Sequence, residues 1–124
     1  MRSCVFPQTR KQEGASIDMM LLEHQAKGLF VRYGIATPLG SLVEGMGDVI
    51  EVPGRSVVKA QIPAGGRGKG GGILFADDPE DAAKKAAILL ESDIAGHRVS
   101  SVLVEERVEH TEEFYLSLTA DPGI

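Results

Sequence analysis

Residues 56–75, SVVKAQIPAGGRGKGGGILF, place a glycine-rich, basic loop between two short apolar runs. The runs at 56–61 and 73–75 are bounded by turn-forming residues, and the first is rich in valine, so both are predicted to be strands. Six of the nine residues from 64 to 72 are glycine. Because glycine lets the backbone turn sharply and approach a ligand closely, we expect a hairpin whose tip can bind an anion.

The composition is that of one small globular domain. Of the 124 residues, 43% are hydrophobic and 25% are charged, and the net charge of −5 argues against a protein that coats nucleic acid. Cys4 is the only cysteine, which excludes an intrachain disulfide and a cysteine-based metal cluster. No apolar run approaches the roughly 20 residues that span a bilayer. We therefore expect no nucleic-acid or membrane partner, and a cytoplasmic location, with the mitochondrial matrix as the alternative.

Two helices are predicted beside the strands. Apolar residues at 22, 26, 29, 30 and 33 share one helical face, with Asp18 as the N-cap and Gly34 as the left-handed stop. Asp77 or Asp78 caps the second helix, and Pro79 takes its first position. The predicted buried face of this second helix consists of Ala83, Ala86, Ala87, Ile88 and Leu90.

Two further strands are predicted at 101–105 and 114–119, which gives an α+β fold with a mixed sheet and flanking helices. Gly45 and Gly47 interrupt any helix between residues 40 and 54, so no element is predicted there. Residues 1–18 lack the apolar stretch of a secretory signal and are expected to form a disordered extension. The folded domain is accordingly expected to cover residues 19–124.

The loop is positively charged within an acidic protein. Arg67 and Lys69 lie among its glycines, and Lys59 on the preceding strand can point a flexible ammonium group at the same phosphates. The loop is not a P-loop, since no Gly-Lys-Ser or Gly-Lys-Thr precedes a helix, and not a Rossmann turn, since a strand follows it. A mobile glycine hairpin with two solvated charges is the other interpretation, and the loop alone leaves both open.

A group of acids connects the last two predicted strands. Such acids can bind sugar hydroxyls, or a metal ion with phosphates attached, although a solvated connection has the same composition. They are Glu105, Glu106, Glu109, Glu112 and Glu113. The three histidines have neither metal-ligand spacing nor an evident nucleophile beside them, so no catalytic residue is assigned.

Taken in order, these stretches resemble the amino-terminal part of the β subunit of succinyl-CoA synthetase, an ATP-grasp acyl-CoA ligase. The resemblance runs from about residue 19 to residue 119 and implies the small subdomain of an ATP-grasp domain, truncated before the second subdomain. The matching segments are LEHQAK (22–27), LF (29–30), RYG (32–34), PLG (38–40), VVKAQ (57–61), AGGRGK (64–69), GG (71–72), LVE (103–105) and EFYL (113–116).

The resemblance implies that ATP or ADP binds with Mg²⁺. It places Lys59 at the nucleotide phosphates. Gly66, Arg67 and Gly68 correspond to the loop that folds over those phosphates.

The family's linker between its subdomains maps onto the acid-rich connection. Glu105 corresponds to the position that meets the purine, and Val108 to a position that contacts the nucleotide through its backbone. Glu113 corresponds to a carboxylate that holds the ribose hydroxyls. The family's magnesium-binding Asn and Asp have no counterpart up to Ile124, so the metal ligands are expected beyond that residue and none is assigned here.

For the whole enzyme, the resemblance implies a reaction of the tricarboxylic acid cycle. Succinate, CoA and ATP give succinyl-CoA, ADP and phosphate, by way of a phosphohistidine on a partner α subunit. The 124-residue chain alone is expected to be catalytically incomplete. Two alternatives remain: a malate–CoA ligase or ATP-citrate lyase type of enzyme, and a non-catalytic module that binds a partner through its uncovered last strand.

Overall fold

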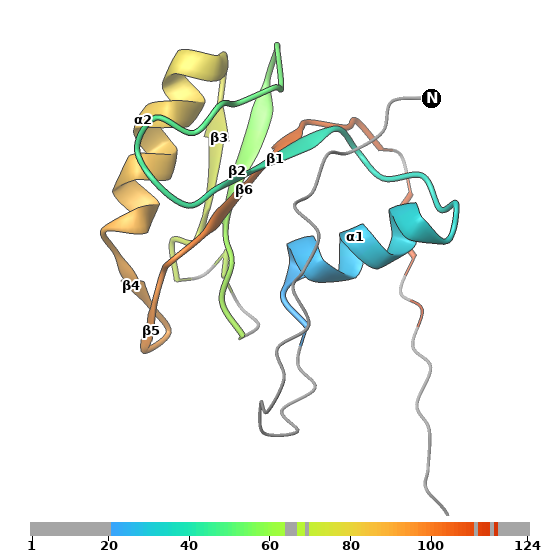
Figure 1. Ribbon diagram of the computed structural model, residues 1–124, viewed down its shortest axis with the longest axis horizontal. Coiled ribbons are helices and arrows are strands. Elements are labelled where there is room, and N and C mark those ends of the chain that lie inside the picture. The colour runs from blue at the N-terminus through green and yellow to red at the C-terminus, as the bar shows by residue number, and fades with distance from the viewer. Residues whose placement is uncertain (1–20, 64–66, 69, 111, 115, 117–124) are drawn as a thin grey trace, which may run out of the picture.

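The computed structural model describes residues 21–63, 67–68, 70–110, 112–114 and 116, and these form a four-stranded sheet with a helix on either side (Figure 1). The sheet order is β1-β6-β2-β3, and β4 and β5 form a separate hairpin. The elements are α1 (Glu23–Arg32), β1 (Gly40–Val43), β2 (Ser56–Ala60), β3 (Ile73–Ala76), α2 (Pro79–Leu90), β4 (Asp93–Ile94), β5 (His97–Arg98) and β6 (Val102–Glu106). The α+β class is confirmed, but the described strands pair only in antiparallel fashion, so this part of the sheet is not mixed.

The strands around the glycine-rich stretch form the predicted hairpin. β2 and β3 are antiparallel, with Lys59 opposite Ile73. The other edge of β2 pairs with β6, where Lys59 lies opposite Leu103 and Val57 lies opposite Glu105. The strand that carries Lys59 is therefore held on both edges.

Side chains along β2 and β6 alternate between two faces of the sheet. Val58, Val102 and Val104 are fully buried on the face covered by α2, which packs against β2, β3 and β6. The residues between them, Lys59 and Glu105 among them, point to the opposite face. The main apolar cluster thus lies on the α2 side of the sheet, and the opposite side carries polar groups together with the fully buried Leu103.

α2 begins as the sequence predicts. Asp78 is the N-cap, its carboxylate accepts a hydrogen bond from the Asp81 N–H at 2.8 Å, and Pro79 follows. The predicted buried face is wrong at Ala83, which is exposed, and at Ile88, which is 59% exposed. The buried residues are Ala82, Ala86 and Leu89. Alanines occupy several faces of this helix, so the apolar pattern does not select one of them.

α1 begins at Glu23, with Leu22 in the N-cap position. The predicted cap, Asp18, lies outside the described residues. The predicted stop is confirmed, since Gly34 has a φ of +78° and the Ile35 N–H reaches back to the Phe30 carbonyl at 2.8 Å.

The apolar face of α1 is not packed into the core. No residue of this helix is buried, and Leu29, Phe30 and Tyr33 are 41%, 45% and 78% exposed. The sequence predicts that these residues share one helical face, and in the described part of the chain that face is exposed at Leu29, Phe30 and Tyr33. Within the described residues, α1 instead contacts the sheet through its polar side.

Three other expectations concern the ends and connections of the chain. β1 occupies the region where no element was predicted, and β4 and β5 turn at Ala95 and Gly96. Of the predicted strand at 114–119, Phe114 and Leu116 are described; both are exposed and neither lies in a strand. The rest of that strand and the extension at 1–18 lie outside the described residues. Within the described ranges, no helix is both long enough and apolar enough to cross a bilayer.

Candidate functional site

Five charged side chains from α1, β2, β6 and the glycine-rich loop meet on the face of the sheet opposite α2. We name this group the charged cluster; it consists of Glu23, Lys27, Lys59, Arg67 and Glu105. The side chains are only 5% to 20% exposed. Three are cationic and two are anionic, so the cluster has a net charge of +1 in a protein whose net charge is −5.

Lys59 lies at the centre of the cluster. Its Nζ donates to Glu23 Oε1 at 2.9 Å and to Glu105 Oε1 at 2.8 Å. Because Val57 is opposite Glu105 and shares a face with Lys59, the contact with Glu105 is a diagonal pair across two strands. Burial alone would lower the pKa of Lys59, but the hydrogen bonds to Glu105 and Glu23 outweigh it and raise the pKa above the ordinary 10.5. Lys59 is therefore cationic at neutral pH.

Glu23, the first residue of α1, bridges three cations. Its Oε1 accepts from Lys59 and lies 3.1 Å from Lys27 Nζ, while its Oε2 lies 2.6 Å from Arg67 Nη2. Burial would raise the pKa of Glu23, but the Lys59 hydrogen bond, followed by the charges of Lys27 and Lys59, lowers it from 4.5 to about 2. The carboxylate is therefore ionised at any physiological pH.

Arg67 lies folded back against the end of β2. Its Nη1 donates to the Ala60 carbonyl at 2.9 Å. The Gly72 N–H donates to the Arg67 carbonyl at 2.7 Å, and the Ala60 N–H donates to the Gly72 carbonyl at 2.8 Å. A Cβ on Gly72 would lie 3.2 Å from Arg67 Cβ, so a larger residue would fit here only if the neighbouring atoms shifted.

Polar contacts attach α1 to the sheet. The His24 backbone N–H donates to Gln61 Oε1 at 2.8 Å, and the His24 ring Nδ1 lies 3.0 Å from the same oxygen. Lys27 Nζ donates to Glu105 Oε2. These contacts explain why the polar side of α1 faces the sheet.

The structure brings together three of the seven residues assigned to the nucleotide from the sequence. Lys59, Arg67 and Glu105 belong to the charged cluster. Gly68 is exposed and directly follows Arg67, while Gly66 lies outside the described residues. The cluster thus includes the strand lysine and the loop arginine that the sequence assigns to phosphate.

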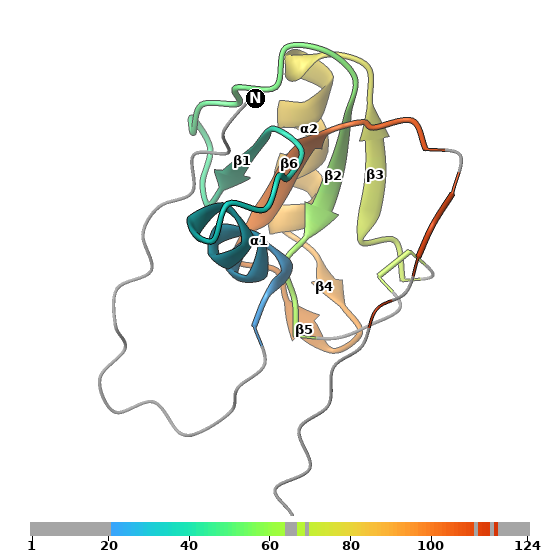
Figure 2. The same ribbon diagram turned by 90° about the vertical axis from the view of Figure 1, so that its right-hand side faces the viewer.

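Two of the seven residues lie on the segment after β6 and form none of the ion pairs that hold the cluster together. Val108 and Glu113 are both exposed, and the Glu113 carboxylate lies 2.6 Å from His110 Nε2. The described part of this segment runs along the same side of the sheet as α1, away from α2 (Figures 1 and 2).

Glu23 and Lys27 were not among the predicted site residues. Their spacing of four residues in LEHQAK is a helical acid–lysine pair, which is common on exposed helix faces. Only the folded arrangement shows that both side chains turn toward β2 and β6. A local pattern could therefore indicate the pair but not its partners.

The lysine and arginine side chains of the charged cluster are suited to binding a phosphate chain. Lysine and arginine groups bind phosphate oxygens through strong, charge-assisted hydrogen bonds. In the described ranges, no group of three or more His, Cys, Asp or Glu side chains is arranged to hold a metal ion.

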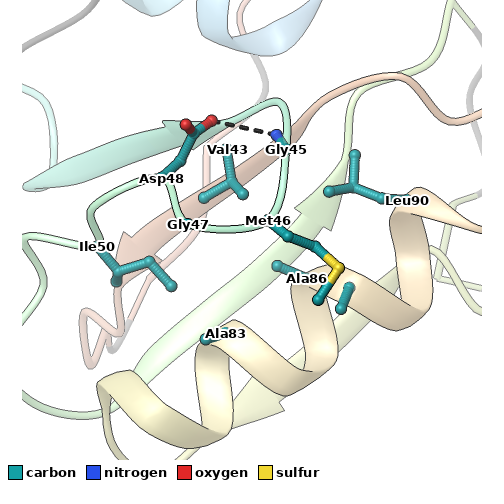
Figure 3. A pocket seen from close by; sticks show the side chains of 10 residues that line it. Val43, Gly45, Met46, Gly47, Asp48, Ile50, Ala83, Ala86 and Leu90 are labelled. Atoms are coloured by element: carbon teal, nitrogen blue, oxygen red, sulfur yellow. Dashed lines mark hydrogen bonds between the residues drawn. The ribbon is translucent and has the colours of Figure 1, made fainter.

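A shallow pocket of about 110 Å³ lies between residues 43–50 and α2 (Figure 3). Apolar side chains and glycines form most of its described lining, together with one carboxylate, Asp48. That carboxylate accepts the Gly45 N–H at 3.1 Å and the Glu44 N–H at 2.8 Å. Since no cation is among the described lining residues, this pocket does not complement a phosphate chain as the charged cluster does.

Comparison with known proteins gives one family and a consistent set of relatives. Residues 20–123 match the family model described as ATP-grasp domain. The chain is 43% identical to the succinate–CoA ligase [ADP-forming] subunit beta of Methanocaldococcus jannaschii, over 83% of this chain and 29% of that protein. It is 42% identical to subunit beta 2 of the same enzyme from Streptomyces coelicolor, over 83% of this chain and 28% of that protein.

The name of a third relative contains GDP in place of ADP. The succinate–CoA ligase [GDP-forming] subunit beta of Thermus thermophilus is 41% identical, over 83% of this chain and 28% of that protein. The chain spans less than a third of the length of these curated relatives. Their names confirm the resemblance to the β subunit of succinyl-CoA synthetase.

Proposed function

Because the chain belongs to the ATP-grasp family, we propose that it forms the nucleotide-binding part of a succinate–CoA ligase β subunit. The observation that carries this proposal is the charged cluster. It holds Lys59 of β2 and Arg67 of the glycine-rich loop side by side, with an excess of positive charge, in an otherwise acidic protein. Phosphoryl transfer depends mainly on positioning and charge neutralisation, which such groups supply.

Each residue assigned from the sequence has a proposed role. Lys59 binds the nucleotide phosphates, and the loop at 66–68 closes over them through its backbone N–H groups. Glu105 marks the start of the linker that meets the purine. Val108 contacts the nucleotide through its backbone, and Glu113 accepts hydrogen bonds from the ribose hydroxyls; the exposure of both leaves them accessible.

The activity of the whole protein is part of the same proposal. The substrates would be succinate, CoA and ATP or GTP, with Mg²⁺ neutralising phosphate charge, and the partner would be an α subunit. No residue of this chain is assigned to catalysis or to the metal. We propose residues 19–124 as the small-subdomain side of the nucleotide site, and the cytoplasm or the mitochondrial matrix as the compartment. A malate–CoA ligase or ATP-citrate lyase type of enzyme would share this nucleotide site and differ in the acid it accepts.

Calorimetric titration with ADP, at fixed Mg²⁺, tests the nucleotide site. Lys59→Met is expected to weaken ADP binding at least tenfold, because it removes the central cation of the cluster. Lys84→Met is the matched control: Lys84 is 72% exposed on α2, on the far side of the sheet, so binding should stay within twofold. Absence of ADP and GDP binding to the unmodified protein would overturn the proposal, as would equal affinities for the two variants when both are folded by circular dichroism.

A further inference from the structure

We propose that Glu23 is a positioning residue of the phosphate site, which gathers Lys59 and Arg67 into one cationic group without itself touching the nucleotide. The inference rests on the proposed function above and adds a residue to it. Its starting point is that a single carboxylate, at the first turn of α1, contacts every cation of the charged cluster.

Like charges do not gather without counter-charges. The ammonium groups of Lys27 and Lys59 both lie within 3.1 Å of Glu23 Oε1, and Arg67 Nη2 lies 2.6 Å from Glu23 Oε2. Without Glu23, Glu105 would still hold Lys27 and Lys59, but Arg67 would lose its carboxylate partner and would be repelled by the two lysines. With Glu23 present all three cations stay together, and the whole cluster, Glu105 included, retains a net charge of +1, so an incoming phosphate still finds a positive site.

The geometry also fixes the direction of Lys59. A lysine ammonium has three N–H donors, and Glu23 and Glu105 accept two of them in the described structure. Two carboxylates from different elements, α1 and β6, restrain the ammonium from two sides. The remaining N–H is then directed in advance, which reduces the ordering cost of binding a phosphate oxygen.

Arg67 is restrained by one hydrogen bond and one ion pair. One end of its guanidinium donates to the Ala60 carbonyl and the other meets Glu23. The contact with Glu23 ties the loop to α1, whereas the contact with Ala60 ties it to β2. Glu23 therefore links the helix to both groups that are proposed to act on phosphate.

An opposite role for Glu23 is physically possible and predicts an opposite sign. A carboxylate on Lys59 and Arg67 could act as an internal competitor that phosphate must displace. Removing a competitor would tighten nucleotide binding, whereas removing a positioning residue weakens it. The sign of the change therefore distinguishes the two roles.

The test compares Glu23→Gln with Glu80→Gln. Both glutamates lie in the first turn of a helix and pair with a lysine four residues on, but Glu80 is 82% exposed on α2 and outside the cluster. Calorimetry with ADP and with adenosine, at fixed Mg²⁺, separates phosphate contacts from base and ribose contacts. We expect Glu23→Gln to weaken ADP binding about tenfold and to change adenosine binding less than twofold, and Glu80→Gln to change neither by more than twofold. In a Lys59→Met background, Glu23→Gln should weaken ADP binding by much less.

Several outcomes would overturn the inference while leaving the proposed function intact. Tighter ADP binding would show competition, and unchanged binding would show no role. Equal losses for ADP and adenosine would show a merely structural effect. If Glu23→Gln does not fold, Glu23→Asp keeps the charge but moves the carboxylate, and ADP binding should then weaken about threefold; tighter or unchanged binding would again overturn the inference. If the unmodified protein binds no nucleotide, the proposed function fails and this inference fails with it.

Discussion

Arg67 of the glycine-rich hairpin meets Glu23 of α1, with Nη2 and Oε2 2.6 Å apart. The contact ends a continuous series of ion pairs that runs from Arg67 through Glu23 and Lys59 to Glu105 and Lys27. Each member has at least one partner of opposite sign, which is the condition under which partly buried charges are tolerated. Removing one member should therefore affect the stability of the protein and its dependence on pH.

Acidification should remove the stabilisation that Glu23 provides. Its pKa is about 2 in the folded protein and 4.5 ordinarily, so the contribution is complete above about pH 5 and is lost as the pH falls through 2. The shift corresponds to roughly 3 kcal/mol, which solvent screening of the partly exposed side chain reduces to about 2 kcal/mol. Urea denaturation at pH 7 should find Glu23→Gln less stable by about that amount, with a smaller difference at pH 3. A difference that does not change with pH, or one equal to that of Glu80→Gln, would contradict this assignment.

The corrected face of α2 can be tested with two adjacent residues. Leu89 is 2% exposed within the core, and Ile88 is 59% exposed. Leu89→Ala should lower the free energy of unfolding by roughly 3 kcal/mol, because it leaves a cavity. Ile88→Ala should cost less than about 1 kcal/mol, since little area is lost and alanine favours the helix. Denaturant titrations of both variants measure the difference, and a larger loss for Ile88→Ala would place the buried face where the sequence predicted it.

The N-terminus of α2 depends on one aspartate of an adjacent pair. Asp78 accepts the Asp81 N–H at 2.8 Å, so Asp78→Ala should destabilise the protein by about 1 kcal/mol. Asp77 contributes its backbone N–H, which donates to the Asp81 carboxylate at 3.1 Å, and Asp77→Ala keeps that group. Thermal unfolding should therefore show a loss of stability for Asp78→Ala and a loss of less than about 0.5 kcal/mol for Asp77→Ala. Equal drops would mean that general negative charge near the helix, and not the cap, is responsible.

A methyl group at Gly72 should disturb the loop that carries Arg67. The added Cβ would lie 3.2 Å from Arg67 Cβ, 3.3 Å from the Arg67 carbonyl and 3.3 Å from Ile94 Cδ1. Gly72→Ala should therefore cost about 1–3 kcal/mol of stability and, if the proposed site is correct, weaken ADP binding. Gly54→Ala is the control, because an added Cβ there meets nothing within 4 Å. Similar denaturation midpoints for the two variants would show that the loop accommodates the methyl group.

The elements predicted correctly from the sequence are those with local signals. Pro79 after an aspartate, Gly34 after an apolar helical pattern, and valines beside a glycine run each act within a few residues. β1 has no such signal, because its formation depends on pairing with β6 from the far end of the described chain. The hairpin of β4 and β5 is only two residues long on each side, too short for a periodic pattern.

Prediction of the candidate site from the sequence is limited in the same way to residues with local signals. Lys59, Arg67 and Glu105 could be named from the sequence because they lie in distinctive motifs. Glu23 and Lys27 could not be assigned a role, because a helical pattern identifies two faces of α1 but not which one meets the sheet. In this protein, ion pairs with Lys59 and Glu105 hold the polar face of α1 against the sheet, and the apolar residues of α1 remain outside the core.

The alternation of side chains along β2 and β6 gives a simple rule for interpreting variants of this protein. In both strands the even-numbered residues, such as Val58 and Val104, face the core under α2, and the odd-numbered residues face the other side, where Lys59 and Glu105 belong to the charged cluster and Leu103 is buried. A harmful substitution at an even position should reduce the amount of folded protein. A harmful substitution at Lys59 or Glu105 should disturb the ion pairs of the cluster and, if the proposed site is correct, also impair ligand binding. A step of one residue, from Val58 to Lys59 or from Val104 to Glu105, thus moves a substitution from the apolar core to the charged cluster.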